Sequence, residues 1–187
     1  MAMSTKDEIL AEIAITGDVM ISKEDNTIIV KGKLGTLKKD FTRLPATVTV
    51  NNKEIIIKPY GTRKKDLAIT NTAKSIINSM IHGVEKGFTY KLKIVYAHFP
   101  ISVKVKGQEI YVENFFGERS PRISRIVDDS TRVNVVGEDV IVQGPSLEYV
   151  SQTAANIESS TRIKDKDQRV FLDGLYIYAR EKGMPPH

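Results

Sequence analysis

An internal repeat constrains the fold of this chain more than any other feature of its sequence. The run Val30-Lys31-Gly32-Lys33-Leu34-Gly35 recurs in the second half of the chain as Val112-Glu113-Asn114-Phe115-Phe116-Gly117. The segment 48–57 recurs at nearly the same offset as 133–142, and an amphipathic stretch follows each copy. Each copy spans roughly 80–90 residues, a size at which small domains fold on their own. The sequence therefore predicts two tandem domains, residues 1–85, including an N-terminal extension, and residues 86–187.

In the first copy, short strands precede one helix. β-branched runs broken by turn residues predict strands at 19–22, 27–31, 37–41, 48–51 and 54–58. Apolar residues then recur at helical spacing from Ile69 to Val84, and Gly83 and Gly87 mark the end of that helix. The G-x-x-G run at 32–35 has the outline of a KH-type clamp, but its place between two strands favours a hairpin turn.

The second copy follows the same order. Strands are predicted at 90–94, 101–106, 110–113, 132–136 and 139–143, with Lys91 and Lys93 on one face of the first of them. Ser146 is the expected N-cap of a helix, and a short helix at 167–172 and a strand at 175–179 close the chain. The predicted fold class is α+β, with two copies of a two-layer unit in which an antiparallel sheet packs on one helix.

Composition limits the function classes that remain. The chain has no cysteine, which excludes disulfides, thiolate metal sites and a cysteine nucleophile. No apolar run approaches the ~20 residues of a membrane-spanning helix, and nothing in the first twelve residues has the apolar core of a secretory signal. We therefore expect a soluble protein of the cytoplasm that makes no membrane contact.

Charge is segregated along the chain. Residues 31–65 carry ten bases and two acids, whereas residues 126–159 carry one base and six acids. Segregated signs indicate that one surface faces a polyanion, although folding can also mix such blocks in space. The basic clusters are 63–65, the arginines around Pro121 (Arg119, Arg122 and Arg125), and the tail cluster of Arg162, Lys164, Lys166 and Arg169. Loop cations of this kind reach phosphates, so the pattern favours RNA over an ordinary solvated face.

No active site is evident. The three histidines are far apart and lack metal-ligand spacing, and the adjacent carboxylates at 128–129 and 138–139 point to opposite faces of a strand. We predict no catalytic residue, no metal and no cofactor, and hence no enzyme.

Several ordered motifs resemble one family. They are Gly83-Val84-Glu85-Lys86-Gly87-Phe88, Val95-Tyr96-Ala97-His98-Phe99-Pro100-Ile101, Glu113-Asn114-Phe115-Phe116-Gly117-Glu118, and Phe171-Leu172-Asp173-Gly174-Leu175-Tyr176. Together they resemble the L6 family of large-subunit ribosomal proteins in its archaeal and eukaryotic form, which is called L9 in eukaryotes. The resemblance covers almost the whole chain and is weak only over residues 1–15.

The resemblance implies two tandem α+β domains and a structural role in the large ribosomal subunit. The implied partners are large-subunit rRNA near the factor-binding region, at the sarcin–ricin loop and stalk base, neighbouring ribosomal proteins, and translation factors that bind transiently. The second domain is expected to supply most rRNA contacts. The candidate rRNA-binding residues are Lys91, Lys93, His98, Arg119, Arg122, Arg162, Lys164, Lys166 and Arg169. His98 lies in a matching run, either on the RNA or packed internally.

One departure and two alternatives stay open at this point. The family often has a more basic stretch where this chain has residues 120–125, so contacts there are expected to be fewer. The first alternative is a free-standing RNA-binding or ribosome-assembly module, which co-sedimentation with large subunits would distinguish. The second is an enzyme acting on a polyanion, for which the sequence offers no pocket of carboxylates or histidine.

Overall fold

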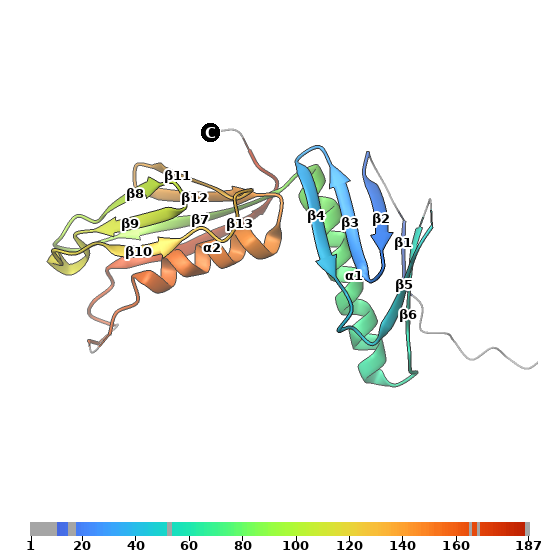
Figure 1. The fold of residues 1–187 in the computed structure, drawn as a ribbon. Helices are drawn as coiled ribbons and strands as arrows, with labels where there is room; N and C mark the ends of the chain where they lie inside the picture. The colour runs from blue at the N-terminus through green and yellow to red at the C-terminus, as the bar shows by residue number, and fades with distance from the viewer. Residues whose placement is uncertain (1–10, 15–17, 52–53, 165, 168, 186–187) are drawn as a thin grey trace, which may run out of the picture. The chain divides into compact units, whose positions relative to one another are not determined.

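Antiparallel strands joined by hairpins make up most of this protein, because its β-branched runs are short and turn residues separate them. The computed structural model describes residues 11–14, 18–51, 54–164, 166–167 and 169–185. The chain divides into two units, Met1–Glu85 and Lys86–His187. Each unit has its own sheets, one long helix and a hydrophobic core (Figure 1).

The first unit holds two three-stranded antiparallel sheets and the helix α1, Lys64–Glu85. One sheet has the order β1-β6-β5, from Ala11–Ala14, Glu54–Pro59 and Ala46–Val50. The other has the order β2-β3-β4, from Met20–Glu24, Thr27–Gly32 and Gly35–Asp40. α1 packs against both sheets and buries Ala73, Ile77 and Val84 in the core between them.

The second unit begins with the strands β7, β8 and β9, at Phe88–Val95, Ser102–Lys106 and Glu109–Glu113. The 3₁₀ turn η1 (Phe115–Gly117) leads into β10, β11 and β12, at Arg122–Arg125, Arg132–Val136 and Asp139–Gly144. The helix α2 (Leu147–Ser160) and the strand β13 (Gly174–Lys182) follow. The sheets have the orders β11-β12-β7-β13 and β10-β9-β8, and α2 packs on both.

The two units share one topology. In each, the first strand pairs with the strand that precedes the helix, as β1 with β6 and β7 with β12. That strand pairs in turn with the one before it, and the three strands between form a second sheet. The predicted α+β class with tandem sheet-on-helix units is therefore confirmed. Two details are new: each unit splits its strands between two small sheets, and β13 adds an edge strand to the second unit that has no counterpart among the described residues of the first.

Three local predictions are confirmed. Gly32 and Gly35 face each other at the end of the β3–β4 hairpin, so the G-x-x-G run is a turn. The Ser146 hydroxyl accepts a hydrogen bond from the Tyr149 N–H at 3.4 Å and caps α2. Gly87 has a φ of +74° just beyond α1, a conformation that costs glycine little. Gly83, in contrast, lies inside α1 rather than ending it.

Besides that of Gly83, two local predictions are wrong. Residues 122–125 form the strand β10 rather than a loop. The described residues of the segment 167–172 form a single turn instead of a helix, in which the N–H groups of Val170 and Phe171 both donate to the Asp167 carbonyl. Residue 168 lies outside the described part. Val170, Phe171 and Leu172 are exposed, so this segment has no buried apolar face to stabilise a short helix.

Candidate nucleic-acid interface

Three segments of the second unit converge at one end of it. They are the β7–β8 loop (96–101), the stretch from η1 to β10 (114–121) and the α2–β13 connection (161–173), of which residues 165 and 168 are not described. The Asn114 side-chain amide donates to the Pro100 carbonyl at 3.0 Å, which joins the first two segments. The rings of Phe116 and Phe171 lie with centroids 5.9 Å apart, which joins the second and third. We call the described residues of these segments the loop end.

The turn at the centre of the loop end has an unusual backbone. Asn114 and Phe116 have φ values of 59° and 51°, and Gly117 follows at 73°. Left-handed geometry at a non-glycine residue costs of order 1 kcal/mol. Phe115 fills the core beneath, in edge-to-face contact with Phe116 at 4.7 Å. The turn thereby directs the Phe116 ring towards Phe171 and within 5.9 Å of the Lys166 ammonium.

Arg122 holds the loop end together from inside. Its guanidinium donates to both Glu118 carboxylate oxygens, from Nε at 2.9 Å and from Nη2 at 2.7 Å. Nη1 donates to the carbonyls of Ser160 and Arg162, at 3.0 and 3.2 Å, just where α2 ends. The same group stacks 4.2 Å from the centroid of the Phe115 ring. Arg122, although predicted as an RNA contact, therefore donates its hydrogen bonds to groups of the protein itself.

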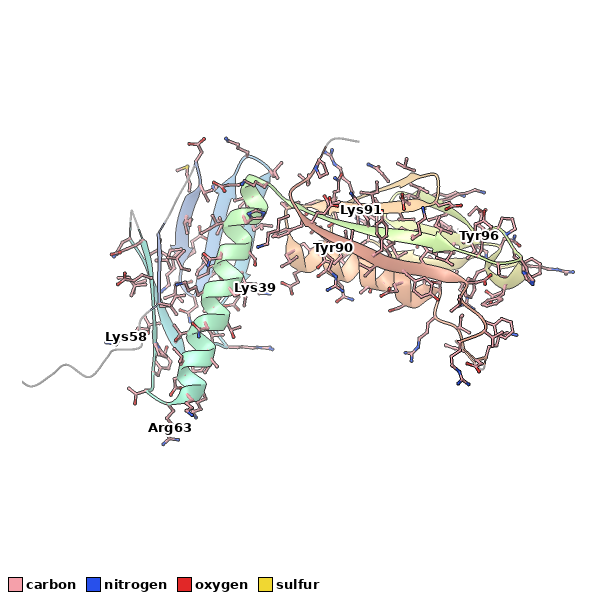
Figure 2. All side chains as sticks on the ribbon, turned by 180° about the vertical axis from the view of Figure 1, so that it is seen from behind. Lys39, Lys58, Arg63, Tyr90, Lys91 and Tyr96 are labelled. Carbon is pink, nitrogen blue, oxygen red and sulfur yellow. The ribbon has the colours of Figure 1, made fainter. Side chains whose placement is uncertain are left out.

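Lys91 and Lys93 project from the open face of β7, opposite the core residues Leu92 and Ile94, as the alternation predicts. Figure 2 labels Lys91 on this strand. The Lys91 ammonium lies 2.8 Å from a carboxylate oxygen of Glu181 on β13, and this hydrogen bond raises the pKa of Lys91.

Lys93 also faces carboxylates. Its Nζ lies 3.4 Å from Glu138 and 3.5 Å from Asp139, at the start of β12. Desolvation lowers the pKa of Lys93, but hydrogen bonds and charge from these carboxylates outweigh it, and the net shift is upward. Both lysines of this face are thus partly neutralised by the protein itself.

Of the other predicted RNA-binding residues, Arg169 also has a carboxylate partner. Arg169 pairs with Asp167 at 2.9 Å, whereas His98, Arg119, Arg162, Lys164 and Lys166 are exposed on the loop end. His98 is therefore not packed internally. Among the described residues, no ion pair engages the side chains of Arg119, Arg162, Lys164 or Lys166. Lys166 lies 4.9 Å from the Phe171 ring centroid, a cation–π contact.

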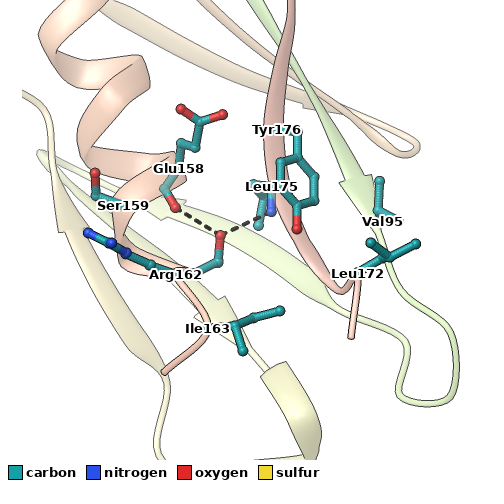
Figure 3. A pocket seen from close by; sticks show the side chains of 9 residues that line it. Val95, Glu158, Ser159, Arg162, Ile163, Leu172, Leu175 and Tyr176 are labelled. Carbon is teal, nitrogen blue, oxygen red and sulfur yellow. Dashed lines mark hydrogen bonds between the residues drawn. The ribbon is translucent and has the colours of Figure 1, made fainter. Parts of the chain in front are cut away.

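A cavity of about 490 Å³ opens beside these cations, where α2 ends (Figure 3). Val95, Ile163, Leu172 and Leu175 provide apolar walls, and the Tyr176 ring forms one side. The polar side chains of Glu158, Ser159 and Thr161 also line it. Arg162 is the cation that lines it. Sequence reasoning missed the aromatic and apolar members of this site, because it singled out only cations and His98 as candidates. The signal was present in the alternation of Leu175, Tyr176 and Ile177, which turns Tyr176 outward from β13.

The basic cluster at 63–65 lies in the first unit, at the start of α1, and Figure 2 labels Arg63 there. The Arg63 N–H donates to the Asp66 carboxylate at 2.8 Å, which caps the first turn of the helix.

In the part of the chain that the structure describes, no three His, Asp or Glu side chains come together as metal ligands. No helix of the described residues is both long and apolar enough to cross a membrane.

Comparison with known proteins decides the family. The family model described as ribosomal protein L6 matches residues 99–174, which include most of the loop end. Large ribosomal subunit protein uL6 of Methanosphaera stadtmanae is 44% identical over 165 residues, covering 88% of this chain and 90% of its own length. The chain belongs to the ribosomal protein L6 family. The resemblance inferred from the sequence motifs is thereby confirmed.

Other archaeal relatives extend the match. The uL6 proteins of Ignicoccus hospitalis and Saccharolobus solfataricus are 42% and 40% identical, and each comparison covers 91% of this chain and 94% of the relative. These matches support the archaeal and eukaryotic type of the family that the motifs indicated. The L6 family consists of structural ribosomal proteins, so membership confirms the prediction that this chain is not an enzyme.

Proposed function

We propose that this protein is a structural constituent of the large ribosomal subunit in the cytoplasm, and that it binds large-subunit rRNA through the loop end of its second unit. The relatives that it matches over nearly their whole length are named as large-subunit proteins. The observation that carries the placement is the contrast in pairing. On the sheet face, Lys91 and Lys93 form ion pairs with carboxylates. On the loop end, Arg162, Lys164 and Lys166 are exposed and have no such partner among the described residues.

Unpaired cations favour a polyanion for a physical reason. Each Lys or Arg that meets a phosphate releases condensed counterions, whereas a lysine already held by a carboxylate first has to give up that partner. Arg162, Lys164, Lys166 and Arg119 are therefore the proposed phosphate contacts, with exposed His98 beside them. Lys91, Lys93 and Arg169 are proposed as weaker, secondary contacts. Arg122 acts on the RNA through the loops that it positions.

The finer location rests on the family resemblance alone. It supports a contact near the factor-binding region, at the sarcin–ricin loop and the stalk base, with neighbouring ribosomal proteins alongside and translation factors that bind transiently. The acidic stretch 126–159 is then available to basic neighbours or factors, because it carries one base against six acids.

Sedimentation of a cell lysate through a sucrose gradient tests the proposed function. We expect one copy of the protein per large subunit, retained after a high-salt wash. Presence only at the top of the gradient would contradict the ribosomal role and favour the alternative, a free-standing RNA-binding or assembly module.

A further inference from the structure

We propose that the cavity at the end of α2 receives a single unpaired nucleobase of the rRNA, with the Tyr176 ring as its stacking wall and Arg162 on the adjoining phosphate. This inference rests on the proposed function, and it specifies the chemical group that one part of the loop end recognises. It predicts that an extruded base, and not only the phosphate backbone, contacts this protein.

The size and lining of the cavity suit a base. Its volume of about 490 Å³ exceeds that of one nucleobase and lies within the range of ordinary ligand sites, roughly 300–1,000 Å³. Val95, Ile163 and Leu172 provide apolar walls, and Tyr176 provides a π face. Unstacked RNA bases are held in this way, between an aromatic ring and apolar side chains.

The floor of the cavity is held in place before any ligand arrives (Figure 3). Buried Thr161 donates its hydroxyl to the Glu158 carbonyl at 3.1 Å and accepts the Leu175 N–H at 3.0 Å. The Glu158 carboxylate accepts the Ile177 N–H at 3.0 Å, so α2 and β13 are joined twice. Arg122 fixes the rim through the Ser160 and Arg162 carbonyls. The Thr161 hydroxyl is thereby satisfied and one oxygen of the Glu158 carboxylate is engaged, so the shape of the floor is fixed.

Charge indicates that the occupant is a nucleotide. Arg162 lines the cavity, and Lys164 and Lys166 follow it in the chain, all three exposed. Tyr176 is 42% exposed and Leu172 is 57% exposed, so the apolar mouth of the cavity is open to solvent beside several cations. A nucleotide satisfies both features at once, since its base covers the apolar mouth and its phosphate meets the cations. An uncharged apolar side chain from a neighbouring protein would use only the first feature.

Blocking the cavity tests this inference. Leu172→Trp adds bulk at the cavity mouth, and Val170→Trp adds the same bulk two residues away, at a position that is 70% exposed and not part of the lining. The assay is filter binding of the full chain to protein-free large-subunit rRNA from the same organism. We expect Leu172→Trp to weaken binding about tenfold, as the loss of one stacked base does, with no change in the salt dependence. We expect Val170→Trp to bind within about twofold of wild type.

Three outcomes would overturn the inference. Wild-type affinity of Leu172→Trp would show that the cavity is not used. A defect that appears only in whole subunits, and not on protein-free rRNA, would assign the cavity to a neighbouring protein. If Leu172→Trp unfolds, ultraviolet cross-linking of the wild-type complex decides, because a nucleotide adduct on Tyr176 is expected and its absence would refute the proposal. Failure of the wild type to bind rRNA at all would instead contradict the proposed function.

Discussion

Replacing Arg122 with alanine separates a positioning role from direct RNA contact. The Arg122 side chain is only 28% exposed, and its guanidinium contacts Glu118, the end of α2 and the Phe115 ring at once. A partly exposed bidentate ion pair contributes ~0.5–1 kcal/mol, a cation at a helix C-terminus ~0.3–1 kcal/mol, and a cation–π contact ~0.5–1 kcal/mol. Glu118 is 41% exposed and can hydrate when its partner is removed. Together these contributions predict a loss of about 2 kcal/mol in the free energy of unfolding.

The assay is urea unfolding of the full chain followed by circular dichroism. With a slope of about 2 kcal/mol per molar urea, the midpoint for the second unit should fall by about 1 M. Arg125→Ala is the matched control, because Arg125 ends the same strand with an 82% exposed side chain and one contact of 3.8 Å to Glu109. We expect that variant to unfold within experimental error of wild type.

The pH dependence has a definite sign. The hydrogen bond from Arg122 holds the pKa of Glu118 below its usual value. A depressed carboxyl pKa contributes stability above the unfolded-state pKa, near 4.3, and this contribution is lost as the pH falls through the folded-state pKa. The difference between wild type and Arg122→Ala should therefore be largest near neutral pH and shrink in acid. An undiminished difference at low pH would refute the role assigned to Glu118.

The salt dependence of rRNA binding shows whether Arg122 positions the loops or contacts a phosphate itself. If its donors serve the protein, Arg122→Ala weakens rRNA binding without changing how steeply affinity falls with salt. An unchanged unfolding midpoint, together with a salt slope reduced by about 0.7–0.9, would show that Arg122 contacts a phosphate directly.

Three further variants test other parts of the structure. Ser146→Ala removes the N-cap of α2; since its hydrogen bond is long at 3.4 Å, we expect a loss of only about 0.5–1 kcal/mol in thermal unfolding. Gly32→Ala would place a Cβ 2.7 Å from the Val84 side chain, so amide-exchange protection should fall in the first unit and persist in the second, at a cost of about 1–3 kcal/mol. Changing Asp128 and Asp129 to lysine should leave the protein in the large-subunit peak of a sucrose gradient, because these acids belong to the surface assigned away from rRNA.

The tandem topology was predictable because it depends on order and spacing. Strand, hairpin and helix recur in the same order and at a nearly constant offset in the two halves of the chain. Local chemistry such as the turn at 32–35 and the cap at Ser146 is encoded within a few residues. The split of each unit into two small sheets was not predictable in this way, because strand partners such as β1 and β6 are far apart in the sequence.

The candidate site was predictable only as a set of residue types. The sequence placed Lys91 on an outward face, but its partner Glu181 arrives from β13, ninety positions later, through a register that no local pattern specifies. Arg122 likewise meets carbonyls 38 and 40 positions away. Which cations face solvent and which face carboxylates is therefore a tertiary property.

The salt dependence of rRNA binding, measured for two pairs of lysines, distinguishes the loop end from the sheet face as the site of rRNA contact. Lys164→Ala/Lys166→Ala removes two cations of the loop end, and Lys91→Ala/Lys93→Ala removes two that carboxylates already hold on the sheet face. The slope of log affinity against log salt concentration should fall by about 1.4–1.8 for the first pair and hardly change for the second. A fall confined to the Lys91 and Lys93 pair would contradict binding at the loop end and place the rRNA on the open face of the sheet.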